Sequence, residues 1–430
     1  MHDALLRVVL QDNTWLERGD VAPWCAGHLP EPFLARKLVL RAKDRVCLVV
    51  GPRQAGKSTL IWKHLAQRGR AALYLNCEEP AIREWTSSAA TFMSELGQLG
   101  KRPAALFLDE VQRLPEAGLF LKGLVDRRTA MTLYATGSSS FDLAAATRES
   151  LAGRAERHLL LPLSIAEAAG RVPPARALAD RRYAAAARRM LLYGGYTTVV
   201  LGPQPEAELA GLVEAFVVRD ASDRFRVQRL PAFRRILELA AGQVGSLCNY
   251  SEWAAVAGIS NDTVDDYVGL LEETHIVRTL RPFAGGRRSE VTRARKIFFL
   301  DNGIRNVLCG GFAPERSRAD RGALHENLVL TEIAKTVSPL LDDICYWRSK
   351  AGAEVDFVVR HRGRLAGVEV KAGAAGGRLS RSARSFLEAY RPELMLVVSE
   401  DPPRMTRHGT TRVRWIRLWE VAPALAAFLG

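Results

Sequence analysis

Residues 51–59, GPRQAGKST, constrain the fold of this chain more than any other stretch. They match the pattern GxxxxGK[ST], they follow the apolar run RVCLVV at 45–50, and a helical pattern continues after them to about Arg68. A strand, a glycine loop and a helix in this order form a phosphate-binding loop, in which backbone N–H groups converge on phosphate oxygens. The residues that we expect to contact the nucleotide are Gly51, Pro52, Arg53, Gln54, Ala55, Gly56, Lys57, Ser58 and Thr59.

Two side chains of this loop have specific chemical roles. We expect Lys57 to pair with the β- and γ-phosphates of ATP and so to serve catalysis. We expect the Ser58 hydroxyl to ligate Mg²⁺. The loop therefore predicts ATP and Mg²⁺ as cofactors.

The run AALFLDE at 104–110 supplies the acidic groups that such a site needs. Asp109 ends an apolar strand, where a carboxylate is costly unless it serves an ion, so we expect it to hold the Mg²⁺ shell. Glu110 is then placed to orient or deprotonate the attacking water, which favours hydrolysis over nucleotide binding alone. In YATGSSS at 134–140, Thr136 and Ser138 either contact the γ-phosphate or the water, or are ordinary residues at a strand end.

Two arginines are candidates for stabilising the charge of the transition state. Arg154, in ESLAGRAERHLLLPLS at 149–164, acts within its own subunit, acts from a neighbouring subunit of a homo-oligomer, or is a solvated arginine at a helix end. The sequence leaves these three roles open. Arg53, inside the phosphate loop, is a weaker candidate for the same role.

Residues 233–300 read as a helix, a short helix, a turn, a third helix and a two-stranded ribbon, which is the order of a winged helix-turn-helix. The third helix is acidic, and because carboxylates repel phosphates we do not expect it to read the major groove. The ribbon is basic, so we expect contacts to the DNA backbone there, with low sequence specificity. The alternative is a packing module that joins its neighbours. The predicted DNA contacts are Arg287, Arg288, Arg293, Arg295 and Lys296.

Residues 351–373, AGAEVDFVVRHRGRLAGVEVKAG, read as two apolar strands that carry carboxylates. Regular alternation places Asp356 and Val358 on the same face of the first strand, and Glu369 and Lys371 on one face of the second. We expect Asp356 and Glu369 to bind Mg²⁺, and Lys371 to support an attacking water catalytically. Glu326, on the preceding helix, completes the predicted metal site.

This arrangement resembles the Asp…Glu-x-Lys core of restriction-endonuclease-like nucleases, also written PD-(D/E)XK. The resemblance implies an α/β domain that binds or cuts DNA. Two alternatives stay open: the core persists only as a binding surface, or the stretch is a hairpin held by salt bridges.

A series of short motifs along the chain resembles bacterial and archaeal AAA-type ATPases with a C-terminal domain of unknown function, class 4143. In order, the motifs are GPRQAGKSTL, LFLDEVQRLP, ATGSSS, LAGR…LPLS and YGGY. The resemblance covers nearly the whole chain and implies ATP binding and a role around DNA. One departure is visible: Thr197 stands where that family usually has proline after YGGY.

Short apolar strands alternate with helical spacers from residue 45 onward, which indicates a parallel sheet covered on both faces. The expected fold class is therefore an α/β P-loop ATPase with a parallel sheet, followed by a winged helix-turn-helix and a PD-(D/E)XK nuclease-like α/β domain. The expected division is a helical segment at 1–44, the AAA-type ATPase core at 45–168, a helical lid or connector at 169–232, the winged helix at 233–314 and the endonuclease-like domain at 315–430.

The composition bears on partners and on the compartment. The net charge of +14 favours a polyanionic partner such as DNA. We expect no membrane segment and no secretory signal, and the scattered cysteines indicate reduced thiols in a cytoplasmic protein. These features favour an ATPase that acts on DNA, by remodelling, translocation or cleavage. The alternative is an ATP-controlled switch or scaffold for a protein partner, with an inactive nuclease-like domain.

Overall fold

The computed structural model describes residues 3–16, 19–41, 44–69, 71–99, 103–137, 151–217, 221, 227–285, 294–309, 311–339 and 341–430. The chain divides into two compact units: unit 1 comprises residues 1–161 and 273–275, and unit 2 comprises residues 162–272 and 276–430. Each unit has its own sheet and its own core, so each is described by itself.

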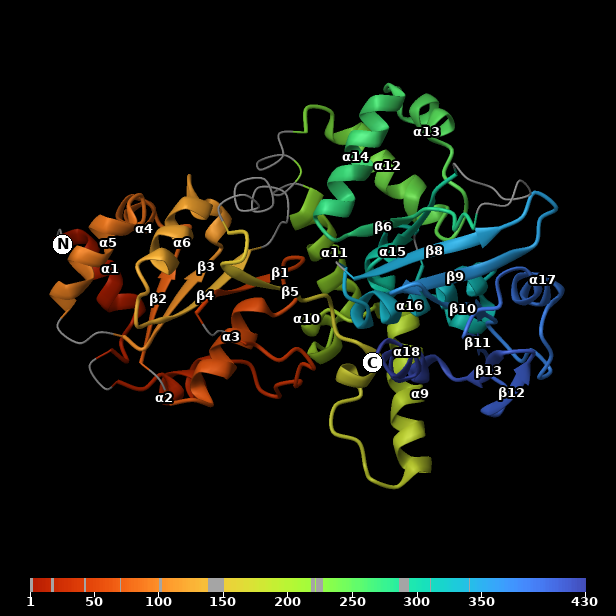
Figure 1. Ribbon diagram of the computed structural model, residues 1–430. Helices are drawn as coiled ribbons and strands as arrows, with labels where there is room; N and C mark the ends of the chain where they lie inside the picture. Colours follow the sequence, from red (N-terminus) through yellow and green to blue (C-terminus); the bar gives the residue numbers. More distant parts are fainter. Residues whose placement is uncertain are drawn as a thin grey trace. The chain divides into compact units, whose positions relative to one another are not determined.

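Unit 1 is built on a parallel sheet with the strand order β2-β3-β4-β1-β5 (Figure 1). The middle strands are short apolar runs that are almost wholly buried, because both of their faces are covered. This confirms the predicted α/β class with a parallel sheet. The strands are β1 (Val46–Val50), β2 (Ala72–Asn76), β3 (Ala105–Asp109), β4 (Thr132–Gly137) and β5 (Ala155–Leu159).

Helices pack on both faces of this sheet (Figure 1). One face carries α1 (Asp3–Asp12), α4 (Pro80–Trp85), α5 (Ala89–Leu96) and α6 (Ala117–Asp126), and the other carries α2 (Ala22–His28) and α3 (Lys57–Ala66). Two short 3₁₀ turns, η1 (Gly97–Leu99) and η2 (Val111–Arg113), follow α5 and β3.

Of the expected helical segment at 1–44, the part that the structure describes is helical over α1 and α2. Residues 29–41 form no helix. Pro30 and Pro32 lie at the start of this stretch, and each removes a backbone donor that a helix would need.

Unit 2 contains a second sheet with the strand order β12-β13-β11-β10-β9-β8. The strands β10, β11 and β13 run parallel to one another, and the remaining pairs are antiparallel. Helix α17 packs on one face of this sheet, and α16 and α18 pack on the other. The strands are β8 (Asp342–Arg348), β9 (Glu354–His361), β10 (Arg364–Val370), β11 (Leu394–Val398), β12 (Arg404–His408) and β13 (Thr411–Ile416), and the helices are α16 (Arg321–Thr336), α17 (Arg381–Tyr390) and α18 (Val421–Leu429).

The rest of unit 2 is mainly helical. Helices α12, α13 and α14 precede the antiparallel pair β6 and β7, which is the element order expected for a winged helix; the assignment itself stays a prediction. Every helix among the described residues is too short or too polar to reach across a bilayer. The elements are α8 (Ile165–Ala168), α9 (Arg176–Tyr193), α10 (Thr197–Leu201), α11 (Pro205–Ala215), α12 (Leu230–Gly242), α13 (Tyr250–Ala257), α14 (Asn261–Glu273), β6 (Val277–Leu280), β7 (Lys296–Phe299), α15 (Asn302–Leu308), η4 (Glu315–Ser317) and η5 (Leu418–Glu420).

One hydrophobic core joins most of the helices of unit 2 to one face of its sheet. It joins side chains of α12 and α14, such as Phe233 and Val264, to side chains of the six-stranded sheet, such as Val368 and Leu396. Helices α12, α13 and α14 therefore share a core with the six-stranded sheet.

A buried carboxylate fixes the YGGY turn within this unit. Asp301 caps α15, where its Oδ1 accepts from the N–H groups of Gly303 at 2.8 Å and Ile304 at 3.2 Å. Its Oδ2 accepts from Gly195 N at 2.7 Å. Gly194 has φ +69°, and a Cβ there would lie 1.9 Å from Asp301 Oδ1, so this position requires glycine.

Candidate functional site

The phosphate loop connects β1 to α3 at the carboxyl end of β1. Two of its glycines have backbone angles that other residues rarely adopt, with φ +153° at Gly51 and +88° at Gly56. A Cβ on Gly51 would lie 2.1 Å from the carbonyl oxygen of Leu160, which follows β5. This close approach excludes a side chain and keeps the loop against the neighbouring strand.

Lys57 is the first residue of α3, and it is buried. Its Nζ donates to the carbonyl oxygens of Gly51 at 3.1 Å and Pro52 at 2.9 Å. The ammonium group is therefore held over the loop itself. Contacts of the nucleotide with this lysine and with the other loop residues stay predictions.

Asp109 ends β3 and contacts Ser58 directly. Ser58 Oγ donates to Asp109 Oδ1 at 2.9 Å, and the Thr136 hydroxyl on β4 donates to the same oxygen. Tyr74 OH donates to Oδ2 at 3.3 Å. Burial raises the pKa of Asp109, and the hydrogen bonds from Thr136 and Ser58 act against this shift. The two predicted Mg²⁺ ligands are thus side by side.

Glu110 follows in a left-handed backbone conformation, with φ +57°. Such a conformation costs a non-glycine residue about 1–3 kcal/mol, so surrounding contacts must hold it. Glu110 N donates to Thr136 Oγ1 at 3.0 Å, and Gln112 Nε2 donates to the Glu110 carboxylate. The Thr136 hydroxyl therefore bonds to both acidic residues, while Ser138 lies outside the described residues.

Two residues near this site were not predicted from the sequence. Arg36 donates from NH1 to the loop carbonyl of Ala55 at 2.9 Å and from NH2 to Leu161 O at 2.5 Å. Tyr74 contacts Asp109 from β2, the next strand of the sheet. No motif marks either residue: Arg36 lies in an irregular stretch, and Tyr74 reads as an ordinary strand aromatic.

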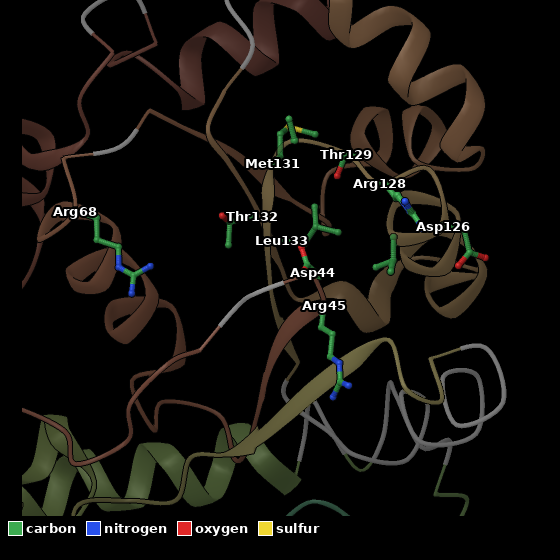
Figure 2. A pocket seen from close by; sticks show the side chains of 11 residues that line it. Asp44, Arg45, Arg68, Asp126, Arg128, Thr129, Met131, Thr132 and Leu133 are labelled. Atoms are coloured by element: carbon green, nitrogen blue, oxygen red, sulfur yellow. The ribbon is translucent and has the colours of Figure 1, made fainter.

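Arg154 lies at the end of the sheet opposite to the phosphate loop. It directly precedes β5, which pairs in parallel with the whole of β1, so the length of a strand separates it from the loop. Its Nε donates to Asp126 Oδ1 at 2.6 Å. Asp126 also lines a hollow of about 990 Å³ together with Arg45 and Arg128 (Figure 2). This position does not fit action on the loop of the same subunit; action from a neighbouring subunit stays a prediction.

In unit 2, the four predicted nuclease-like residues lie in one cluster. Lys371 Nζ pairs with Glu369 Oε1 at 2.9 Å, and Ser380 Oγ donates to Glu369 Oε2 at 3.1 Å. Burial raises the pKa of Glu326, and the nearby charge of Asp356 raises it further. Burial also raises the pKa of Asp356, and the charge of Glu369 adds to the shift. Carboxyl groups perturbed in this way are typical of functional sites.

A β-bulge aims Asp356 differently from the prediction. Here two residues of β9, Asp356 and Phe357, lie opposite one residue of β8, Tyr346. Val355 and Val358 consequently belong to the same hydrophobic cluster, so the expectation of strict alternation in this strand is wrong. The carboxylate of Asp356 accepts from Val370 N at 2.7 Å, at the end of β10.

The metal role of this cluster stays a prediction. In the described part of the chain, no group of three or more His, Cys, Asp or Glu side chains is arranged to hold a metal ion. Asp356 and Glu369 bond instead to a backbone N–H, a hydroxyl and an ammonium group. Each carboxylate has about four lone-pair sites, so these contacts leave room for ligation of Mg²⁺.

The predicted DNA contacts separate into two groups. Arg287, Arg288 and Arg293 lie outside the described residues. Arg295 is half-buried, and Lys296 is only 3% exposed, with its Nζ paired with Glu354 and no surface to offer a DNA backbone. The charge of Lys296 instead lowers the raised pKa values of Glu326 and Asp356.

Comparisons with known proteins find matches along most of the chain. Family models match at residues 43–169 (AAA domain), 185–315 (Domain of unknown function, DUF8612) and 321–417 (Domain of unknown function, DUF4143). Among solved structures, one on katanin self-assembly is 17% identical, with 51% of this chain and 69% of that chain covered and a TM-score of 0.25. AMPPCP-bound DnaA from Aquifex aeolicus is 14% identical, with 53% and 82% covered and a TM-score of 0.21.

Two curated relatives are similar over most of their length. They are uncharacterized proteins of Mycobacterium tuberculosis and Mycobacterium bovis, each 30% identical over 352 residues, which cover 80% of this chain and 73% of the relative. The chain therefore belongs to the family of these two mycobacterial proteins, and it contains an AAA domain and a C-terminal DUF4143 domain.

Proposed function

We propose that this chain hydrolyses ATP in the presence of Mg²⁺ and acts on DNA. The observation that carries the ATPase part is the hydrogen bond of 2.9 Å between Ser58 and Asp109, beside the phosphate loop. A hydroxyl and a carboxylate in contact, next to a loop lysine, form the ligand set that a Mg²⁺-bound triphosphate needs.

The residues of this site divide the work of hydrolysis. Mg²⁺, when bound, neutralises charge on the β- and γ-phosphates. Lys57 binds the same phosphates and stabilises the charge that develops in the transition state. Glu110 orients the attacking water and takes up its proton, and Thr136 positions Glu110 by accepting from its N–H.

The DNA part of the proposal rests on charge and on the carboxylate cluster of unit 2. The net charge of +14 attracts a polyanion. Asp356, Glu369 and Lys371 lie together as the nuclease-like interpretation requires, and the cluster either cuts the strand or grips it. In this proposal the segment at 233–314 is a winged helix and the C-terminal domain is PD-(D/E)XK nuclease-like.

One observation favours the alternative, an ATP-controlled switch for a protein partner. Helix α14 presents the exposed acidic residues Asp262, Asp265 and Asp266, which repel phosphates, and Lys296 of the expected ribbon is buried. An acidic α14 and a buried Lys296 fit a protein contact better than a contact with a DNA backbone.

The experiment is ATP turnover with and without single-stranded, duplex and branched DNA. Lys57→Ala should abolish nucleotide binding, and Glu110→Gln should keep binding and lose turnover. The matched control is Glu84→Gln, an exposed glutamate on α4, which should behave like the wild type. Wild-type turnover in Glu110→Gln would overturn the catalytic assignment, and turnover that no DNA stimulates would favour the switch.

A further inference from the structure

A cavity of about 310 Å³ lies in unit 2 beside the carboxylate cluster. Three of its lining positions directly follow parallel strands: Lys371 after β10, Ser399 after β11 and Arg417 after β13. Helix α9 supplies Ala187 and Arg188 to the lining. In open α/β sheets, the crevice outside the carboxyl ends of parallel strands is where ligands bind.

The charges of this cavity favour an anion. Four cationic side chains and two carboxylates line it, and both carboxylates are engaged elsewhere. Glu315 is bonded to Arg321 and, at 2.8 Å, to His325. Glu400 is paired with Arg321 at 2.9 Å. Arg321, which lies outside the lining, therefore offsets one of the two negative charges, and the cationic side chains of the lining outnumber its carboxylates.

Two of the cationic groups are free to bind. Among the described residues, the guanidinium groups of Arg188 and Arg316 have no hydrogen-bond or ion-pair partner. A guanidinium group matches the geometry of a phosphate, to which it donates two parallel hydrogen bonds. Lys371, at the same cavity, carries a third positive charge, shared with Glu369.

The remaining lining is apolar and aromatic. It includes Leu191, Val398, Leu418 and Trp419. A planar base packs well against such groups, and a tryptophan beside arginines is a common surface for a nucleobase. The volume is at the lower end of ligand pockets, which span about 300–1,000 Å³, so it suits one nucleotide and not a duplex.

We propose that this cavity is a second nucleotide site, which binds a phosphate monoester attached to a base. Arg188 and Arg316 hold the phosphate, and the apolar wall with Trp419 holds the base. The ligand is either a free mononucleotide or the terminal nucleotide of a DNA strand. Binding of a strand end rests on the proposed action on DNA, whereas the site itself does not depend on ATP hydrolysis.

The test is calorimetric titration of the full chain carrying Lys57→Ala, so that the phosphate loop does not contribute. The probes are dAMP, inorganic phosphate, and one short DNA strand with either a 5′-phosphate or a 5′-hydroxyl. We expect dAMP to bind, and to bind more tightly than phosphate. Preference for the 5′-phosphorylated strand over dAMP identifies a strand end as the ligand; the reverse identifies the free nucleotide.

Three variants locate the binding. Arg188→Ala with Arg316→Ala should weaken dAMP binding at least tenfold, because each charge-assisted contact is lost. Arg181→Ala, an exposed arginine of α9 outside the lining, should leave it unchanged. Ala184→Phe fills the cavity while keeping every charge, and it should also abolish binding.

Three results would overturn the proposal: no binding of any probe, equal binding of phosphate and dAMP, or undiminished binding in both the double-arginine and the Ala184→Phe variants. Thermal melting of each variant shows whether it is folded. Because the ATPase assay uses the intact phosphate loop, failure here leaves the proposed ATP hydrolysis untouched, and the reverse also holds.

Discussion

Thr136→Val tests how the nucleotide site is held together, because it removes a hydroxyl and nearly nothing else. Thr136 is fully buried, donates to Asp109 and accepts from Glu110 N at 3.0 Å. Valine keeps the shape of the side chain but leaves Asp109 with one donor fewer and the Glu110 N–H without its partner. A hydrogen bond to a charged group contributes about 1.5–3 kcal/mol, so we expect kcat to fall about tenfold to a hundredfold.

The same substitution should change the Mg²⁺ dependence. Burial raises the pKa of Asp109 and the Thr136 hydroxyl lowers it, so the pKa rises further in the variant. Because a metal ion binds the ionised carboxylate, the variant needs more Mg²⁺, and the defect grows as the pH falls from 8 to 6. Affinity for ATP without Mg²⁺ should stay unchanged, since the loop residues are intact.

The assay is phosphate release as a function of Mg²⁺ at the two pH values, with ATP binding measured separately. Thr132→Val is the matched control: the same change on the same strand, at the end away from the phosphate loop. It should behave like the wild type. Wild-type turnover and Mg²⁺ dependence in Thr136→Val, or an equal loss in Thr132→Val, would refute the reasoning.

Three further results are expected. In Gly194→Ala the new Cβ would lie 1.9 Å from a buried carboxylate oxygen, whereas Gly258, at φ +65°, has open space around it. Gly258→Ala should lower the free energy of unfolding by about 1 kcal/mol, and Gly194→Ala should lower Tm at least three times as much. Equal Tm shifts would contradict the packing argument. The hydrogen bond with Arg318 holds the pKa of Asp320 below its usual range, so Asp320→Asn should lower stability at neutral pH, and the difference should shrink progressively as the pH falls below about 4, where the unfolded carboxyl protonates while the folded one stays ionised; an undiminished difference between pH 5 and pH 2 would speak against this. With the phosphate-loop lysine replaced, Mn²⁺ should raise Tm in calorimetry, more at pH 8 than at pH 6 because burial raises the pKa of Asp356; an undiminished metal effect in Asp356→Ala would exclude it as a ligand.

The nucleotide site was largely predictable because its chemistry is encoded locally. The glycine loop fixes where Lys57 and Ser58 begin a helix, and a carboxylate at the end of a buried strand has few roles other than holding an ion. The contact of Asp109 with Ser58 follows from the shared edge of a parallel sheet. Arg36 was not predictable, since it reaches the loop from a stretch without periodicity.

The errors have a common physical origin: a linear pattern does not show which partner a residue finds. Lys296 adds to a count of basic residues, yet it is buried against Glu354, a residue 58 positions away. For Arg154, whose role the sequence left open, only the pairing of β5 with β1 shows that it lies at the end of the sheet opposite to its own phosphate loop. The bulge beside Asp356 likewise depends on pairing with β8, which strand alternation cannot anticipate.

The continuous core of unit 2 bears on how this protein can be dissected and inherited. The two domains of unknown function meet between residues 315 and 321, but Phe233 and Val264 on one side share a core with Val368 and Leu396 on the other. Cutting the gene between them would expose apolar surface on both fragments, so neither should be soluble when expressed alone. Natural recombination faces the same constraint. We therefore expect these two domains to be gained, lost and transferred as a single piece.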